Sequence, residues 1–217
     1  MRSGTDKQGE ERRRPHRLLL WSLVAALLFW GLQVGQPLED ALRTPRNASH
    51  PTKASGQIVF VGIDDKSLQA VGSWPWPRSK QAELIDRATA DGAKTIVFDL
   101  IYDSPSKPAE DQAFVAALAR SGRVVLADRE RLGNSKARTD QLTRPLPMFL
   151  RSARTASITT DYDYQDAVTT NKISAIVGGK RVPTVAAALA GRDPSDQRSF
   201  WIDYSIRPDT IPYYSAA

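Results

Sequence analysis

The chain of 217 residues contains no cysteine and only two histidines, His16 and His50. Without cysteine it cannot form a disulfide, a thiolate nucleophile or a cysteine-ligated zinc site. Both histidines precede the region in which strands and helices are predicted. Histidine acid–base catalysis and a Ser-His-Asp triad are therefore excluded from that region. We predict no catalytic residue and no cofactor, and the residues leave open whether a metal binds.

The sequence also lacks a long basic patch. The formal net charge is +6, and about half of it comes from residues 1–17, which hold six Arg or Lys and three Asp or Glu. Over the rest of the chain acidic and basic residues are mixed, which does not favour a nucleic-acid partner. Residues 1–17 are predicted to be a solvated, cytoplasmic basic tail.

One uncharged, apolar run follows this tail, from Leu18 to Leu38. As a helix, 21 residues rise roughly 30 Å, the hydrocarbon thickness of a bilayer. The run predicts a single transmembrane helix over 18–38, with Trp21 and Trp30 near its ends. A cleaved signal peptide is the alternative, but the run is long for one and no small-residue cleavage site follows. The excess of Arg and Lys before the run predicts a cytoplasmic N-terminus and an outer domain.

Residues 39–56 are polar and contain Pro45, Pro51 and Gly56, which predicts a linker. After it, apolar strand-like runs alternate with helical patterns, which predicts an α/β fold of three layers with a largely parallel central sheet. The strands are expected at 57–63, 94–102 and 123–127, and the helices at 80–91 and 110–120. The first strand is continuously apolar, as in a strand buried on both faces. A short helical turn is expected at 66–71, and Ser79 is expected to cap the first long helix.

The second half of the domain is less regular. Residues 129–144 are predicted to be an exposed excursion, and 158–164 a strand. A hairpin is expected at 173–182 around Gly178 and Gly179, a helix at 184–190 and a last strand at 200–206. The outer domain is expected to span 57–217.

Acidic residues stand where the predicted parallel strands end, at the edge where α/β sheets bind ligands. A stiff Trp-Pro-Trp-Pro-Arg segment lies between the first strand and the first long helix. From these features we select candidate ligand-binding residues: Asp64, Asp65, Trp74, Trp76, Arg78 and Asp99. The alternatives stay open: the acids can cap helices or pair with Arg78 and Lys66, and the tryptophans can cover the core.

The run V-G-I-D-D-K-S-L-Q-A-V-G-S-W-P-W-P-R, followed by G-A-K-T-I-V-F-D-L-I-Y-D-S-P, resembles the type-two CHASE sensor domain of bacterial receptors. The resemblance covers residues from about Ile58 to the end and is densest up to Asp128. It departs around Asp161–Thr170, where the family's glycine and arginine are missing. The resemblance implies an extracytoplasmic sensor domain on the bacterial inner membrane, followed in a longer receptor by membrane helices and a cytoplasmic cyclase, kinase or cyclic-di-GMP enzyme.

Three functions are compatible with these features. The first is a membrane-anchored sensory domain without catalysis of its own, acting as a homodimer on a small-molecule or protein signal. The second is a metal-dependent α/β hydrolase or phosphoryl-transfer enzyme, because clustered carboxylates can hold Mg²⁺. The third is a dimerisation module without a ligand. The missing histidines and the apolar run favour the first.

Overall fold

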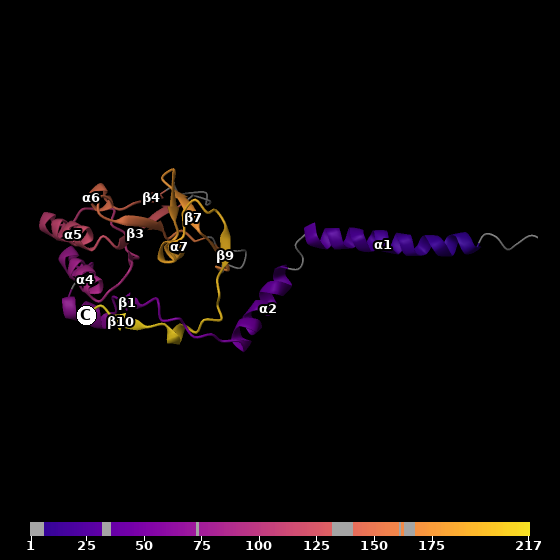
Figure 1. Ribbon diagram of the computed structural model, residues 1–217, viewed down its shortest axis with the longest axis horizontal. Coiled ribbons are helices and arrows are strands. Elements are labelled where there is room, and N and C mark those ends of the chain that lie inside the picture. Colours follow the sequence, from indigo (N-terminus) through magenta and orange to yellow (C-terminus); the bar gives the residue numbers. More distant parts are fainter. Residues whose placement is uncertain (1–6, 32–35, 73, 132–140, 161, 163–167) are drawn as a thin grey trace, which may run out of the picture. The chain divides into compact units, whose positions relative to one another are not determined.

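The computed structural model describes residues 7–31, 36–72, 74–131, 141–160, 162 and 168–217. The chain forms two compact units (Figure 1). One comprises residues 1–57 and 203–211, and the other comprises 58–202 and 212–217. The second is a mixed α/β unit with parallel sheets and C-terminal antiparallel strands, as the sequence predicts in outline.

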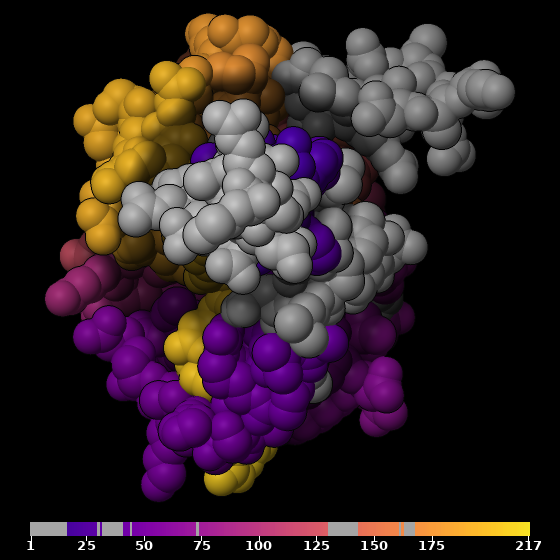
Figure 2. All heavy atoms as spheres, turned by 90° about the vertical axis from the view of Figure 1, so that its right-hand side faces the viewer, coloured from indigo at the N-terminus to yellow at the C-terminus, as the bar shows by residue number. Residues whose placement is uncertain are grey.

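The first unit contains two helices, α1 (Lys7–Gly31) and α2 (Gln36–Ser49). The linker predicted at 39–56 is thus helical as far as Ser49, with Pro45 inside the helix. Thr52 forms a parallel bridge with Ile206, and its backbone N–H donates to Ser205 O at 2.8 Å. In Figure 2 yellow spheres of the C-terminal segment lie beside purple spheres of the segment near residue 50. The short 3-10 helix η1 (Pro208–Thr210) ends this unit.

Helix α1 contains the apolar residues from Leu18 to Gly31 together with the charged residues before them. Within the described ranges, no helix has the length and apolar character needed to cross a membrane.

The central sheet of the second unit is built on β3 (Val124–Arg131). It lies between two parallel neighbours, β2 (Ile96–Phe98) and β5 (Arg154–Ser157). The far end of β3 pairs antiparallel with β4 (Gln141–Thr143). Two predictions are therefore wrong. Residues 129–144 are not simply an exposed excursion, because 129–131 belong to β3 and 141–143 form β4; residues 132–140 lie outside the described residues. Asp128 lies inside β3 rather than after it.

The first apolar run forms a different structure from the one predicted. Only β1 (Phe60–Gly62) is a strand, and it pairs parallel with β10 (Tyr213–Ser215) in a sheet of two strands. We call this pair the β1–β10 ribbon. Phe60 is 57% exposed and Val61 47% exposed, so the prediction of burial on both faces is wrong. A strand with one neighbour and no covering layer leaves its apolar side chains in water.

Two of the helices beside these strands, α3 and α5, end as the sequence predicts. Gly72 ends α3 and Gly122 ends α5, both in the left-handed conformation that glycine adopts without strain. Helix α4 begins at Arg78, directly after Pro77, so Ser79 lies inside the helix and is not its cap. The bounds are α3 (Asp65–Val71), α4 (Arg78–Ala90), α5 (Pro108–Ser121) and α6 (Pro147–Leu150).

The core lies among these helices and the central sheet. Phe98, Tyr102, Phe114 and Phe149 meet edge to face or stacked, with ring centroids 4.8–6.2 Å apart. Such aromatic pairs add stability beyond the area that they bury. Aliphatic side chains complete the cluster: Ile85, Leu118, Val124 and Leu126.

The C-terminal part consists of short antiparallel strands and one helix. The hairpin and the helix after it are confirmed as β7 (Ser174–Val177), β8 (Lys180–Pro183) and α7 (Val185–Leu189). The strand expected as the last, at 200–206, is shorter: β9 (Ser199–Trp201) pairs with β6 (Thr170–Lys172), and β10 follows it. Residues 158–160 are not strand, and most of the rest of that predicted strand lies outside the described residues.

Candidate functional site

The Trp-Pro-Trp-Pro-Arg segment leads directly into α4. Trp74 is 57% exposed, whereas Trp76 is buried with 5% of its surface exposed. Among the described residues the buried indole Nε1 of Trp76 has no hydrogen-bond partner. Trp76 therefore acts as an apolar plug of the core, which was one of the two roles left open by the sequence, while Trp74 stays available to solvent.

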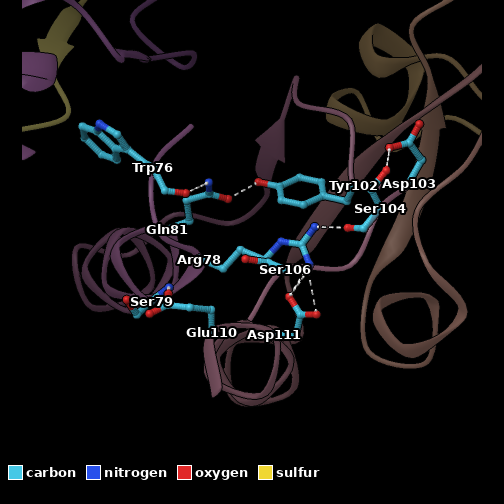
Figure 3. Close-up of polar contacts among 10 residues, drawn as sticks. All are labelled: Trp76, Arg78, Ser79, Gln81, Tyr102, Asp103, Ser104, Ser106, Glu110 and Asp111. Carbon is cyan, nitrogen blue, oxygen red and sulfur yellow. Dashed lines mark hydrogen bonds and ion pairs between the residues drawn. The ribbon is translucent and has the colours of Figure 1, made fainter. Parts of the chain in front are cut away.

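Arg78 is the first residue of α4 and is 9% exposed. Its guanidinium forms an ion pair with Asp111 in the first turn of α5 and also donates to the carbonyl oxygen of Ser104 (Figure 3). The same group lies 4.9 Å from the ring centroid of Phe149 and 5.7 Å from that of Tyr102, both within cation–π range. Arg78 thus joins α4, α5 and the loop after β2.

Further hydrogen bonds extend this contact set, which we call the Arg78 network. Gln81 donates from Nε2 to the carbonyl of Trp76 at 3.2 Å and accepts from the Tyr102 hydroxyl at 2.6 Å (Figure 3). Burial raises the pKa of Tyr102, against the opposing effect of Arg78, so its hydroxyl remains a donor. Every member is engaged within the protein. Asp111 also accepts the Ser106 N–H at 3.1 Å.

A second cross-link joins α4 to α5 at their starts. Glu110 accepts the backbone N–H of Ser79 at 2.6 Å, and this hydrogen bond lowers the pKa of Glu110. A carboxylate there satisfies a backbone donor of the first helical turn, which has no partner within its own helix. The sequence marks Asp111 only as a residue favourable to its own helix and gives no sign that Asp111 and Glu110 reach α4.

Asp64 caps α3, which is the capping alternative that the sequence left open. Its carboxylate accepts the Ser67 N–H at 2.9 Å and the Ser215 hydroxyl at 2.8 Å. These donors lower the pKa of Asp64, the Ser67 N–H most. Because Ser215 lies on β10, Asp64 connects the start of α3 with the β1–β10 ribbon.

The remaining predicted residues join neither the Arg78 network nor the contacts of Asp64. Asp65 and Asp99 are exposed, and Arg78 pairs with Asp111 rather than with one of the predicted acids. Asp128 is fully buried and forms an ion pair with Arg144 at 3.1 Å. Over the described ranges no three His, Cys, Asp or Glu side chains gather closely enough to hold a metal ion. The structure brings Trp76 and Arg78 together and leaves Asp64, Asp65, Trp74 and Asp99 outside that group.

The family model described as the CHASE2 domain matches residues 18–217. The chain therefore belongs to the CHASE2 domain family, as its resemblance implies, and this is a family of extracellular sensory domains of signalling receptors. Neither the curated proteins nor the solved structures contain a match.

Proposed function

We propose that this chain is the membrane-anchored, extracytoplasmic sensory part of a bacterial signalling receptor. It responds to a ligand or protein partner and passes a conformational change through membrane helices to a cytoplasmic output domain. The observation that carries the proposal is the family match over residues 18–217, because it spans the apolar run and the α/β unit together. The family is sensory and not catalytic, which disfavours the metal-dependent enzyme.

The anchor in this proposal is the uncharged run from Leu18 to Leu38, preceded by a basic tail. Such a run with Arg and Lys on its N-terminal side favours insertion with the tail in the cytoplasm. Leu27 and Leu28 lie within it and are exposed in α1, as lipid-facing side chains would be. The α/β unit then stands outside the cytoplasm on the bacterial inner membrane.

A fusion of alkaline phosphatase after Ala217 tests this topology, because the phosphatase is active only outside the cytoplasm. We expect activity in intact cells and recovery of the protein in the carbonate-washed membrane fraction. The double substitution Leu27→Arg and Leu28→Arg should abolish both, whereas the control Leu42→Arg in α2 should not. An inactive fusion that remains in the soluble fraction would refute the anchored receptor.

The route of the conformational change is proposed from the pairing of the segments that flank the α/β core. The stretch from Thr52 pairs with Ile206, and β1 pairs with β10. A ligand changes the conformation of these paired segments only if it binds one of their two arrangements more tightly than the other. Three candidate ligand-binding residues, Asp65, Trp74 and Asp99, are exposed and free to meet a signal.

These three residues can be tested together. If they bind the signal, Asp65→Asn, Trp74→Ala and Asp99→Asn should each weaken the response of the intact receptor without lowering the melting temperature. The matched control is Asp91→Asn, an exposed acid at the end of α4. Unchanged responses in all three variants would remove them from the site.

A homodimer is the second part of the proposal, and the β1–β10 ribbon favours it. Phe60, Tyr213 and Tyr214 are each more than half exposed, and exposed apolar groups of this size on adjacent strands mark contact surfaces. The chain has no native cysteine, so Tyr214→Cys introduces a unique thiol. Oxidation should give a disulfide-linked dimer with Tyr214→Cys and none with the control Ala119→Cys on α5. Cross-linking equal in both variants would contradict an interface at the ribbon.

A further inference from the structure

A pocket of about 470 Å³ opens in the second unit at the amino ends of two parallel strands, away from the acidic residues chosen from the sequence. Val125 on β3 and Arg154 on β5 are register partners and form part of its wall. Residues of α6, β8 and α7 and of the segments next to them also line it. Its volume falls in the range of roughly 300–1,000 Å³ that is usual for small-molecule sites.

The charged residues that the structure describes along this pocket all have one sign. They are three arginines, Arg154, Arg181 and Arg192, with no acidic residue among them. Arg181 donates to the Ser174 hydroxyl at 3.1 Å. Within the described part of the chain, Arg154 and Arg192 have no carboxylate within ion-pair distance.

The two carboxylates nearest in sequence to Arg192 are held elsewhere. Asp193 accepts the backbone N–H of Ser195 at 2.7 Å. Asp196 pairs with Arg198 at 2.8 Å, and hydrogen bonds from Arg198 lower the pKa of Asp196 to about 2, with a smaller contribution from Arg192. Neither carboxylate lines the pocket, and none of the described carboxylates forms an ion pair with its three guanidinium groups.

The rest of the wall is apolar, with Leu150, Val182 and Ala188 among its residues. Guanidinium groups bind carboxylate and phosphate oxygens through paired hydrogen bonds, and apolar walls bind the body of a small organic molecule. We propose that this pocket binds a small organic oxyanion with a carboxylate or phosphate head and an apolar body. Because β5 and β8 both line it, a bound anion bridges the central sheet and the C-terminal hairpin.

Titration calorimetry on the full chain in nanodiscs of zwitterionic lipid tests the proposal, with empty discs as the blank. The probes are hexyl phosphate, hexanoate, hexanol and inorganic phosphate. We expect at least one of the two amphipathic anions to bind at least tenfold more tightly than hexanol and than inorganic phosphate. No binding of either anion at 10 mM (about 2.7 kcal/mol at 25 °C) would overturn the proposal. If hexanol binds as tightly as the amphipathic anions, the proposed role of charge is wrong. If inorganic phosphate binds as tightly as they do, the proposed role of the apolar wall is wrong.

Variants connect the binding to this pocket. Arg154→Gln and Arg192→Gln should each weaken binding of the anion about tenfold or more, since each removes charge-assisted hydrogen bonds. The matched control is Arg151→Gln, an exposed arginine close in sequence that does not line the pocket. Equal weakening by Arg151→Gln would overturn the assignment. Melting temperatures of the variants verify that each is folded.

A phosphate head can belong to a soluble molecule or to a lipid. If the probe binds equally well in discs that contain phosphatidylglycerol, the ligand is a soluble molecule. If the probe no longer binds in those discs, the lipid headgroup occupies the pocket and a soluble ligand is excluded. A role of this pocket in signalling rests on the sensory function proposed above. The calorimetry needs no output domain, so its failure and the failure of the phosphatase fusion are separate results.

Discussion

Two apolar strands of similar sequence have opposite environments in this protein. Val124, Val125 and Leu126 on β3 are at most 1% exposed, whereas Phe60 and Val61 on β1 are 57% and 47% exposed. β3 has a parallel partner on each side, whereas among the described residues β1 pairs with β10 alone. An apolar run therefore predicts a strand, but the number of neighbours and covering layers decides how much of its surface is buried.

The largest expected loss of stability comes from the buried part of the α/β unit, at the Arg78 network. Asp111→Ala leaves the Arg78 guanidinium buried without its carboxylate, and removal of one partner of a buried pair costs about 3–5 kcal/mol. Urea denaturation of the variant measures the loss. The exposed pair Arg120–Asp86 is the control, and Asp86→Ala should change stability by less than about 1 kcal/mol. Equal effects of the two substitutions would mean that Arg78 is solvated.

Substitutions in the two strands test the comparison directly. Leu126→Ala opens a cavity in the core and should lower the free energy of unfolding by about 2–5 kcal/mol. Val61→Ala at a half-exposed position should stay within about 0.5 kcal/mol of the parent protein. The same urea experiment compares them. A large loss from Val61→Ala would mean that the ribbon is buried in solution, and the contrast between β1 and β3 would disappear.

A smaller effect is expected where the ribbon meets α3. The Ser215 hydroxyl lies 2.9 Å from that of Ser67, which is fully buried. Ser215→Ala removes this hydrogen bond and the one to the Asp64 carboxylate, and should cost about 1–3 kcal/mol. Native-state hydrogen exchange should show faster exchange at the backbone N–H of Phe60 and Ala216, two donors at the ends of the ribbon. Unchanged exchange at both sites would mean that the Ser215 contact does not stabilise the ribbon.

The smallest effect is a pH dependence at Asp64. Because the folded protein lowers the pKa of this carboxyl from 3.8, its contribution to stability is present above that value and is lost as the pH falls through the lower folded pKa. Asp64→Asn keeps a capping residue but removes the titration. The parent protein should therefore lose more stability than Asp64→Asn between pH 5 and pH 3, measured as the urea midpoint. Parallel pH profiles would contradict this linkage.

Local patterns predicted much of this fold. The helical spacing of Phe114, Ala117 and Leu118, followed by Gly122, predicts the buried face and the end of α5. Gly178 and Gly179 predict the turn between β7 and β8, which both residues form with positive φ. β5 escaped prediction because Arg-Thr-Ala-Ser has no apolar run, and it is a strand through its pairing with β3.

The site was harder to predict than the fold. Asp64 is a candidate because it follows a predicted strand, and Arg78 because it ends the stiff Trp-Pro-Trp-Pro-Arg segment. Their partners Ser215 and Asp111 lie 151 and 33 residues away in sequence. The arginine-lined pocket has no motif at all, since Arg154 lies on β5, Arg181 on β8 and Arg192 in the loop after α7. Only the pairing of strands brings such residues together.

The parallel pairing in the ribbon also has a mechanical consequence. The Phe60 N–H donates to Pro212 O and the Ala216 N–H donates to Gly62 O, each at 2.9 Å, at opposite ends of the short ladder. Tension between the chain before Phe60 and the chain after Ala216 therefore pulls the two parallel strands past one another and strains these bonds in shear at the same time. An antiparallel pair pulled from one end would instead open bond by bond. The ribbon is thus a stiff coupling for force along the strands and a weak one for force across them.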